Sequence, residues 1–240
     1  ENGMLQEVHV ERSGRRGYVG NIYCGRVKRV MPGMQAAFVD IGLERSAFLH
    51  AADMAHPALN ADPIDGVAPA PASAPPITEL VHEGQRLIVQ VIKDPIGSKG
   101  ARLSTHLSIP SRYLVLLPDS VTLGVSVRIE DEAERERLRG VLAGLVEGGK
   151  FGLIARTNAE GLERDALAED VAYVTRVWQV VAEAIARAQP GQRVYEEPPL
   201  PLRVLRDLMH DDIEKVRVDS RETFERTLDF ARQFMPELAE

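Results

Sequence analysis

Aromatic and basic residues occur close together between Gly20 and Gly42, in the stretch GNIYCGRVKRVMPGMQAAFVDIG. Tyr23 and Phe38 lie within it, and Phe48 follows shortly afterwards. Rings on a strand can stack on nucleobases at about 1–3 kcal/mol a stack, while nearby cations attract the phosphates. The cations available are Arg26, Lys28, Lys93, Lys99 and Arg102. This pattern is typical of a surface that binds single-stranded nucleic acid.

The same rings could instead fill a protein core. Phe38 and Phe48 lie among alanine and aliphatic neighbours, a context that favours burial. For Tyr23 the two interpretations are equally good. Periodicity alone does not decide between a core and a binding surface.

A second candidate site is the pair Arg156-Thr157, at the end of a predicted strand over 151–155. A guanidinium fork and a hydroxyl suit a terminal phosphate. A compact pocket of this kind fits a monophosphate better than a triphosphate, which brings extra charge. As residue types alone, the two side chains also fit an ordinary surface pair.

The acidic residues and histidines form no catalytic or metal-binding set. Asp211 and Asp212 are adjacent, and adjacent helical side chains point about 100° apart, so these two do not converge on one ion. Glu196 and Glu197 precede two prolines and are expected in a loop. The histidines show no ligand spacing. We therefore expect no catalytic residue and no metal site in this chain.

Short β-type segments fill the first part of the chain. Predicted strands cover 6–10, 22–30, 35–41, 47–50, 87–93 and 101–105. The last five, with a long excursion between the third and fourth of them, predict a small OB-type barrel. The excursion, 56–78, is rich in proline and alanine and cannot bury a core, so we expect a mobile loop.

Helical patterns dominate the second part of the chain. Apolar strands are predicted over 112–118 and 151–155, with a helix over 132–146 between them. A long amphipathic helix is predicted from a stripe of apolar side chains spaced by 4 and 3 residues. The stripe comprises Leu167, Val171, Val174, Trp178, Val181 and Ile185. Helices over 201–216 and 220–235, with a short strand around 216–218, complete an α+β fold.

Bulk composition limits the possible classes. The 240 residues carry a net charge of −7, which argues against a generic polyanion binder, although the segment from Glu11 to Val30 is strongly basic. The single cysteine, Cys24, forms no internal disulfide and fits a cytoplasmic location. No stretch reaches the roughly 20 apolar residues of a membrane span. We expect the chain to be part of a longer protein, because its first residues read as a strand entered in mid-fold.

Three motifs resemble the bacterial ribonuclease E/G family: GMQAAFVDIG at 33–42, DPIGSKGARLS at 94–104 and GLIARTNAEG at 152–161. The resemblance covers nearly the whole chain, to about Pro236. It implies an S1-type OB-fold barrel for RNA binding over 20–105. That barrel is inserted in a partial RNase H-like subdomain, 1–19 plus 201–240, and is followed by an α/β 5′-sensor domain over 106–200.

The resemblance also implies site residues. Phe38, Phe48 and Lys99 match the family's contacts to single-stranded RNA, which favours a binding surface over a core for the two phenylalanines. Tyr23 remains a further RNA-binding candidate from its residue type.

The family's 5′-monophosphate pocket falls on Arg156 and Thr157. Backbone contacts to the phosphate fall on Val115 and near Ser111, where the ribonuclease E branch has glycine.

The function implied for the intact protein is Mg²⁺-dependent endoribonuclease activity in ribosomal RNA maturation and messenger RNA turnover. The Mg²⁺ is held by paired aspartates in a catalytic domain further along the chain, and zinc joins protomers, with a homodimer as one expected assembly. Without that domain, this chain is expected to be inactive alone. One alternative is a non-enzymatic S1-type RNA-binding protein, and another is a scaffold whose proline-rich loop docks partners.

Overall fold

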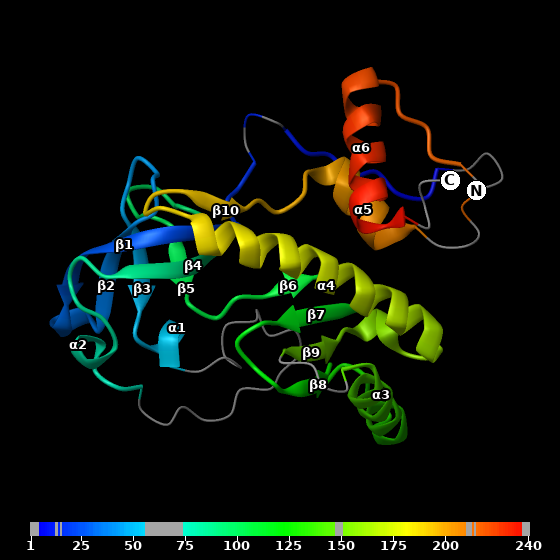
Figure 1. The fold of residues 1–240 in the computed structure, drawn as a ribbon, viewed down its shortest axis with the longest axis horizontal. Coiled ribbons are helices and arrows are strands. Elements are labelled where there is room, and N and C mark those ends of the chain that lie inside the picture. Colours follow the sequence, from blue (N-terminus) through cyan, green and yellow to red (C-terminus); the bar gives the residue numbers. More distant parts are fainter. Residues whose placement is uncertain are drawn as a thin grey trace. The chain divides into compact units, whose positions relative to one another are not determined.

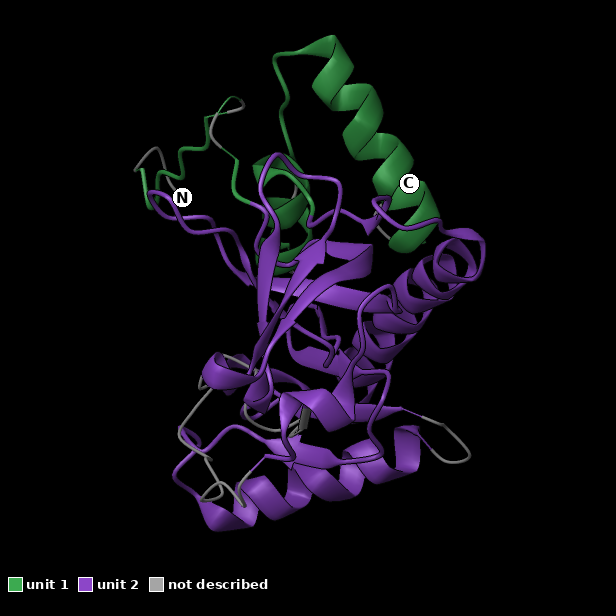
Figure 2. Ribbon diagram, turned by 90° about the vertical axis from the view of Figure 1, so that its left-hand side faces the viewer, with its two compact units in different colours: residues 1–17, 198–240 green, residues 18–197 purple. Residues whose placement is uncertain are grey.

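The computed structural model describes residues 5–12, 14, 16–55, 74–146, 151–209, 213 and 215–236. The chain divides into two compact units, which Figure 2 colours separately. One unit comprises residues 1–17 and 198–240, and the other comprises residues 18–197. The larger unit contains a barrel and a second sheet, and both candidate sites lie in it.

Five strands of the larger unit form a closed barrel (Figure 1). They are β1 (Ile22–Met31), β2 (Ala36–Asp40), β3 (Ala47–His50), β4 (Arg86–Lys93) and β5 (Arg102–Ser104). The strand order is β1-β2-β3-β5-β4, and pairing of β4 with β1 closes the barrel. Only the β3–β5 pairing among these is parallel. A mixed fold with a barrel consistent with the OB type is thereby confirmed.

The barrel interior is filled by the inward side of each strand. Val39, Leu49 and Leu103 are fully buried, as the period of two in a strand requires. The short helices α1 (Ala52–Ala55) and α2 (Ile77–Leu80) flank the excursion between β3 and β4. Ile77 is also fully buried in the barrel core.

The predicted loop over 56–78 is therefore too long at its C-terminal end. Residues 56–73 lie outside the described residues, whereas α2 begins at Ile77. Burial of the Ile77 side chain in the barrel core explains why helical structure begins before the predicted loop ends.

The second sheet of this unit has the order β6-β7-β9-β8. Its strands are β6 (Ile109–Pro110), β7 (Leu114–Leu117), β8 (Leu123–Val125) and β9 (Gly152–Ala155). Helix α3 (Glu132–Leu145) connects the parallel pair β8 and β9 and contacts β8. Helix α4 (Arg164–Arg187) runs along β6 and β7, as Figure 1 shows.

Strand β10 (Arg193–Tyr195) adds a sixth strand to the barrel sheet by pairing with β1. The chain reaches it through Gly191, which meets Gly42 so closely that a Cβ atom on Gly42 would lie 2.1 Å from the Gly191 carbonyl oxygen. Gly42 also has φ +81°, in the left-handed region. The segment after α4 therefore returns to the barrel, a pairing that the sequence did not indicate.

The smaller unit contains α5 (Leu200–Leu208) and α6 (Arg221–Phe234). Ser220 caps α6, since its hydroxyl accepts a hydrogen bond from the Thr223 N–H at 3.3 Å. Residues 6–10 form no strand, α5 ends well before residue 216, and residues 216–218 form no strand. These three sequence-based predictions are wrong. Alternation in a short segment does not supply a partner strand. The backbone leaves the helical region at Met209, which has φ −70° and ψ 132° and ends α5.

Within the described residues, every helix is too short or too polar to cross a lipid bilayer.

Candidate functional site

The barrel carries a row of aromatic and basic side chains across four neighbouring strands. Phe38 of β2 pairs with Arg29 of β1 on one side and with Phe48 of β3 on the other. Phe48 in turn pairs with Arg102 of β5. Directly paired residues place their side chains on the same face of a sheet. Two aromatic rings are therefore flanked by a cation at each end.

Both phenylalanines face outwards. They are half-buried, whereas their neighbours Val39 and Leu49 are fully buried in the barrel. The two ring centroids lie 6.2 Å apart with an angle of 70° between the planes. The ring of His50, which no sequence pattern singled out, lies 6.3 Å from that of Phe48. The residue pattern that favoured burial of Phe38 and Phe48 is thus not followed, and His50 extends the aromatic surface.

Tyr23 does not belong to this surface. Its side chain is 4% exposed and packs in the barrel core. Its hydroxyl lies 3.4 Å from the Asn21 Nδ2 atom, also in the interior. A nucleobase cannot reach a ring that core side chains cover, so the structure corrects this candidate: Tyr23 fills the core.

Lys99 is exposed in the loop between β4 and β5. Its backbone N–H donates to the Ile96 carbonyl at 3.0 Å, which closes a tight turn around Gly97 at φ +58°. A Cβ atom on the next residue, Gly100, would lie 2.1 Å from the Ser46 carbonyl oxygen. This close approach holds the lysine loop against the residue that precedes β3, the strand of Phe48.

Arg102 is fixed in place by a buried carboxylate. Asp53 accepts hydrogen bonds from its Nε and Nη2 atoms at 2.7 and 2.9 Å. The Asp53 side chain is 3% exposed, against 41% for Arg102. Hydrogen bonding to Asp53 raises the pKa of Arg102. The guanidinium at this end of the aromatic row is thus charged and held in one orientation.

The second candidate site lies where β9 ends and the short helix η4 (Thr157–Ala159) begins. The Arg156 backbone N–H donates to the Tyr113 carbonyl at 2.8 Å. Its guanidinium Nη1 donates to the Ser111 carbonyl at 2.6 Å, and Thr157 is exposed beside it. A guanidinium held next to an exposed hydroxyl suits an anion such as a terminal phosphate.

Ser111 and Val115 lie next to this site, and their side chains are buried. Ser111 is fully buried: its N–H donates to the Leu114 carbonyl at 2.8 Å, and its carbonyl accepts from Arg156. Val115 is 2% exposed and lies between Pro110 of β6 and Ile154 of β9. The predicted backbone contacts of Ser111 and Val115 with phosphate remain predictions.

The turn that follows η4 is held by α3. Glu134 accepts hydrogen bonds from Arg137 at 2.6 and 2.7 Å and from the Gly161 N–H at 2.8 Å. Arg137 also donates to the Leu162 carbonyl at 3.0 Å. The Arg137 side chain and the Gly161 N–H lower the pKa of Glu134 to about 2. This charged network fixes the segment just beyond Thr157.

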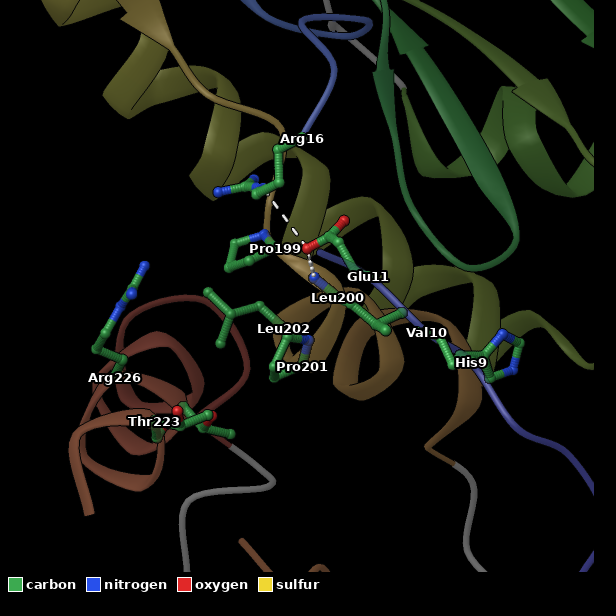
Figure 3. Close-up of a pocket in the computed structure, with 11 residues that line it drawn as sticks. His9, Val10, Glu11, Arg16, Pro199, Leu200, Pro201, Leu202, Thr223 and Arg226 are labelled. Atoms are coloured by element: carbon green, nitrogen blue, oxygen red, sulfur yellow. Dashed lines mark hydrogen bonds and ion pairs between the residues drawn. The ribbon is translucent and has the colours of Figure 1, made fainter. Parts of the chain in front are cut away.

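A separate pocket of about 480 Å³ lies within the smaller unit (Figure 3). Its carboxylate, Glu11, accepts hydrogen bonds from the Leu200 N–H and from Arg203, both at 2.9 Å, and lies 3.5 Å from Arg16. Three donors thus surround this carboxylate, which ties the N-terminal segment to α5.

The described residues contain no group of three or more His, Cys, Asp and Glu side chains placed to hold a metal ion. Asp211 and Asp212 lie outside the described residues. Glu196 forms an ion pair with Arg193 at 2.7 Å, while Glu197 accepts from the Tyr195 hydroxyl at 3.3 Å. These two neighbouring acids therefore have different partners.

Together these features define an α+β protein built on an OB-type barrel with an aromatic and basic outer face. The chain belongs to the ribonuclease E/G family, since the sequence model of the Ribonuclease E/G family matches residues 108–240.

Named relatives resemble the chain along nearly its whole length. Ribonuclease G of Escherichia coli (strain K12) is 50% identical over 239 residues, which cover 99% of this chain and 48% of that protein. Ribonuclease G of Haemophilus influenzae is 46% identical over 240 residues, covering 100% of this chain and 48% of that protein. Ribonuclease E of a Nostoc species is 35% identical over 217 residues, covering 90% and 30%. The chain thus spans about half the length of the ribonuclease G relatives.

Proposed function

We propose that this chain is the RNA-recognising part of an endoribonuclease, with two contact sites for one RNA strand. Single-stranded RNA lies on the outer face of the barrel, on Phe38, Phe48 and Lys99. The 5′-monophosphate of the same strand binds at Arg156 and Thr157. The observation that carries the proposal is the row of two outward rings between two arginines, Arg29 and Arg102.

The barrel site is supported by its chemistry. Rings that are half-buried are held rigidly enough to stack on bases, and any base offers a face for stacking. Lys99 stands on a constrained loop, so its ammonium can neutralise a backbone phosphate without the further entropic cost of ordering that loop. His50 extends the ring surface by one position along β3. Recognition of this kind is tolerant of base sequence, because stacking and phosphate contacts read no base edges.

The phosphate site is supported by the fixed orientation of Arg156. Its Nη1 atom is engaged by the Ser111 carbonyl, which leaves the rest of the planar fork to form parallel hydrogen bonds with phosphate oxygens. The Thr157 hydroxyl adds a donor next to it. A 5′-hydroxyl end offers no charge to this site, so the site distinguishes RNA ends by their phosphate.

In the intact protein, residues 1–19 and 201–240 would form an RNase H-like subdomain and residues 106–200 a 5′-sensor domain. The protein would hydrolyse RNA phosphodiester bonds in the cytoplasm, in ribosomal RNA maturation and messenger RNA turnover. Catalysis would use Mg²⁺ held by paired aspartates in a further domain, and Zn²⁺ would join the protomers of a homodimer. We expect this chain alone to bind RNA without cutting it.

The test is binding of the chain to a short A/U-rich RNA that carries either a 5′-monophosphate or a 5′-hydroxyl. Arg156→Ala should abolish the preference for the monophosphate, and Phe38→Ala should weaken binding of both RNAs. Arg187→Ala and Phe224→Ala are matched controls, because Arg187 and Phe224 are exposed residues on α4 and α6, outside both sites. Binding that depends on neither Phe38 nor Arg156 would reject both sites.

A further inference from the structure

Helix α4 buries an acid against the loop that holds Arg156. Asp170 is 9% exposed and lies on the inner side of the helix, in line with Leu167, Val174 and Val177. A carboxylate in such a position is costly to bury unless hydrogen bonds compensate, and an apolar side chain would pack there without that cost. The position of the charge therefore calls for a specific explanation.

Asp170 collects hydrogen-bond donors from one short loop. Its Oδ2 atom lies 2.5 Å from the Ser111 hydroxyl and 3.0 Å from the Tyr113 N–H. The backbone N–H of Arg112 also forms a hydrogen bond with this carboxyl, whereas the Leu114 N–H donates to the Ser111 hydroxyl at 3.3 Å. Burial raises the pKa of Asp170, and the hydrogen bonds from Ser111 and from the backbone oppose that rise. The loop 111–114 is thus arranged around a single carboxylate.

The same loop turns its carbonyl groups towards the phosphate site. The peptide unit that joins Ser111 to Arg112 directs its N–H to Asp170 and its carbonyl oxygen to Arg156 Nη1, at 2.6 Å. The peptide unit that joins Arg112 to Tyr113 directs its N–H to Asp170 and its carbonyl oxygen to the Asn158 side-chain amide, at 2.6 Å. Two successive peptide dipoles therefore lie between an anion on one side and donor side chains of the site on the other.

The hydrogen bonds on the two sides of these peptide units strengthen one another. A carboxylate polarises the N–H groups that it accepts, and this makes the carbonyl oxygens of the same peptide units better acceptors. The Arg156 guanidinium is consequently held by a carbonyl whose own orientation Asp170 fixes. Asp170 does not touch Arg156 or Thr157 in any of these contacts; it acts through the loop.

We infer that Asp170 is a positioning residue of the 5′-phosphate site, which fixes loop 111–114 so that the loop presents Arg156 to a phosphate. This inference rests on the proposed function, since it assigns Asp170 to the same site. Asp170→Asn should lower the ratio of monophosphate to hydroxyl affinity by about threefold to tenfold, the range expected for one or two lost hydrogen bonds. Affinity for the 5′-hydroxyl RNA, which depends on the barrel, should change by less than about twofold.

The experiment compares both RNAs with wild type, Arg156→Ala, Asp170→Asn, the double variant and Asp165→Asn. Asp165 is an exposed acid in the first turn of the same helix, so Asp165→Asn is the matched control and should behave as wild type. If Asp170 acts through Arg156, adding Asp170→Asn to Arg156→Ala should cause no further loss of preference. A purely structural role would instead change 5′-hydroxyl binding in both backgrounds.

The outcomes separate this inference from the function on which it rests. A preference lost in Arg156→Ala but retained in folded Asp170→Asn would overturn the role of Asp170 and leave the phosphate site standing. No preference in the wild type would overturn both. If circular dichroism shows that Asp170→Asn is unfolded, Ser111→Ala takes its place, because it removes one hydroxyl contact with Asp170 and retains the backbone. A smaller loss of preference in Ser111→Ala supports the role, and an unchanged preference rejects it.

Discussion

Phe38 and Phe48 face each other directly across the β2–β3 pair, and their ring planes meet at 70°. Rings inclined so steeply do not form one flat platform. Each offers its own face, so two bases of a strand would stack on two separate rings. The two contributions should therefore be nearly independent.

Phe38→Ala and Phe48→Ala should each weaken binding of a short single-stranded RNA by about 5- to 150-fold, which corresponds to roughly 1–3 kcal/mol for one base stack. The losses should add in the double variant. Fluorescence anisotropy with labelled RNA measures them, with Phe224→Ala as the control for loss of a partly exposed ring elsewhere. A double variant no weaker than either single one would mean that both rings serve one base.

Lys99 should contribute a phosphate contact that salt can screen. The logarithm of the binding constant of single-stranded nucleic acid falls with the logarithm of salt concentration by about 0.7 per phosphate neutralised. Lys99→Gln should therefore reduce that slope by about 0.7, while Lys215→Gln, at an exposed position in the smaller unit, should leave it unchanged. An unaltered slope in Lys99→Gln would exclude a phosphate contact at this residue.

Gly42 should tolerate no side chain, because it combines a positive φ with the close approach of Gly191. Gly84 has a similar φ, +84°, but a Cβ atom on Gly84 would meet no described part of the chain within 4 Å. Gly84→Ala should lower the free energy of unfolding by about 1 kcal/mol from backbone strain. Gly42→Ala should lower the free energy of unfolding by a further roughly 1–3 kcal/mol, because the new Cβ atom clashes with the Gly191 carbonyl. Urea unfolding measures both, and equal losses would show that the two backbone segments separate without cost.

Glu134 should make stability depend on pH in the acid range. Its folded pKa, about 2, lies below the ordinary value of 4.5, so ionisation favours the folded state. The contribution is complete above about pH 4.5 and is lost as the pH falls towards 2. Glu134→Gln should lower the free energy of unfolding at pH 7 by about 1 kcal/mol, a modest figure because Arg137 is partly exposed to solvent.

The difference between wild type and Glu134→Gln should shrink as the pH falls from 5 to about 2.5. Asp170 is present in both proteins, so its contribution to the pH dependence of stability cancels in this difference. Its raised pKa has the opposite effect, because stability falls as the pH rises past the ordinary pKa of an aspartate. A difference independent of pH would mean that the Glu134 carboxylate gains nothing from Arg137 and Gly161.

Local patterns in the sequence predicted the positions of the barrel strands well. They predicted poorly which side chains point into the core and which point outwards. Glycines and alternation located β1 to β5, but alternation does not say which side is the core, and so Tyr23 and the two phenylalanines needed the structure. The stripe predicted for α4 included Val171 and Trp178, whereas Asp170 and Val177 are buried in their place. An acid enters a core only where tertiary contacts bring N–H groups to it, and helical spacing carries no information on those groups.

The pairing of β10 with β1 has a consequence for the order in which the chain can assemble. The first strand of the barrel receives its outer partner only after about 170 further residues have been synthesised, from Ile22 to Tyr195. Until then the β1 edge at Ile22 and Tyr23 has no partner strand on that side, and unpaired N–H and carbonyl groups at an edge invite association with other chains. Contacts so distant in sequence also slow folding. On the ribosome, the barrel can close once β4 pairs with β1, but this short edge of β1 stays uncovered until the following domain has been made.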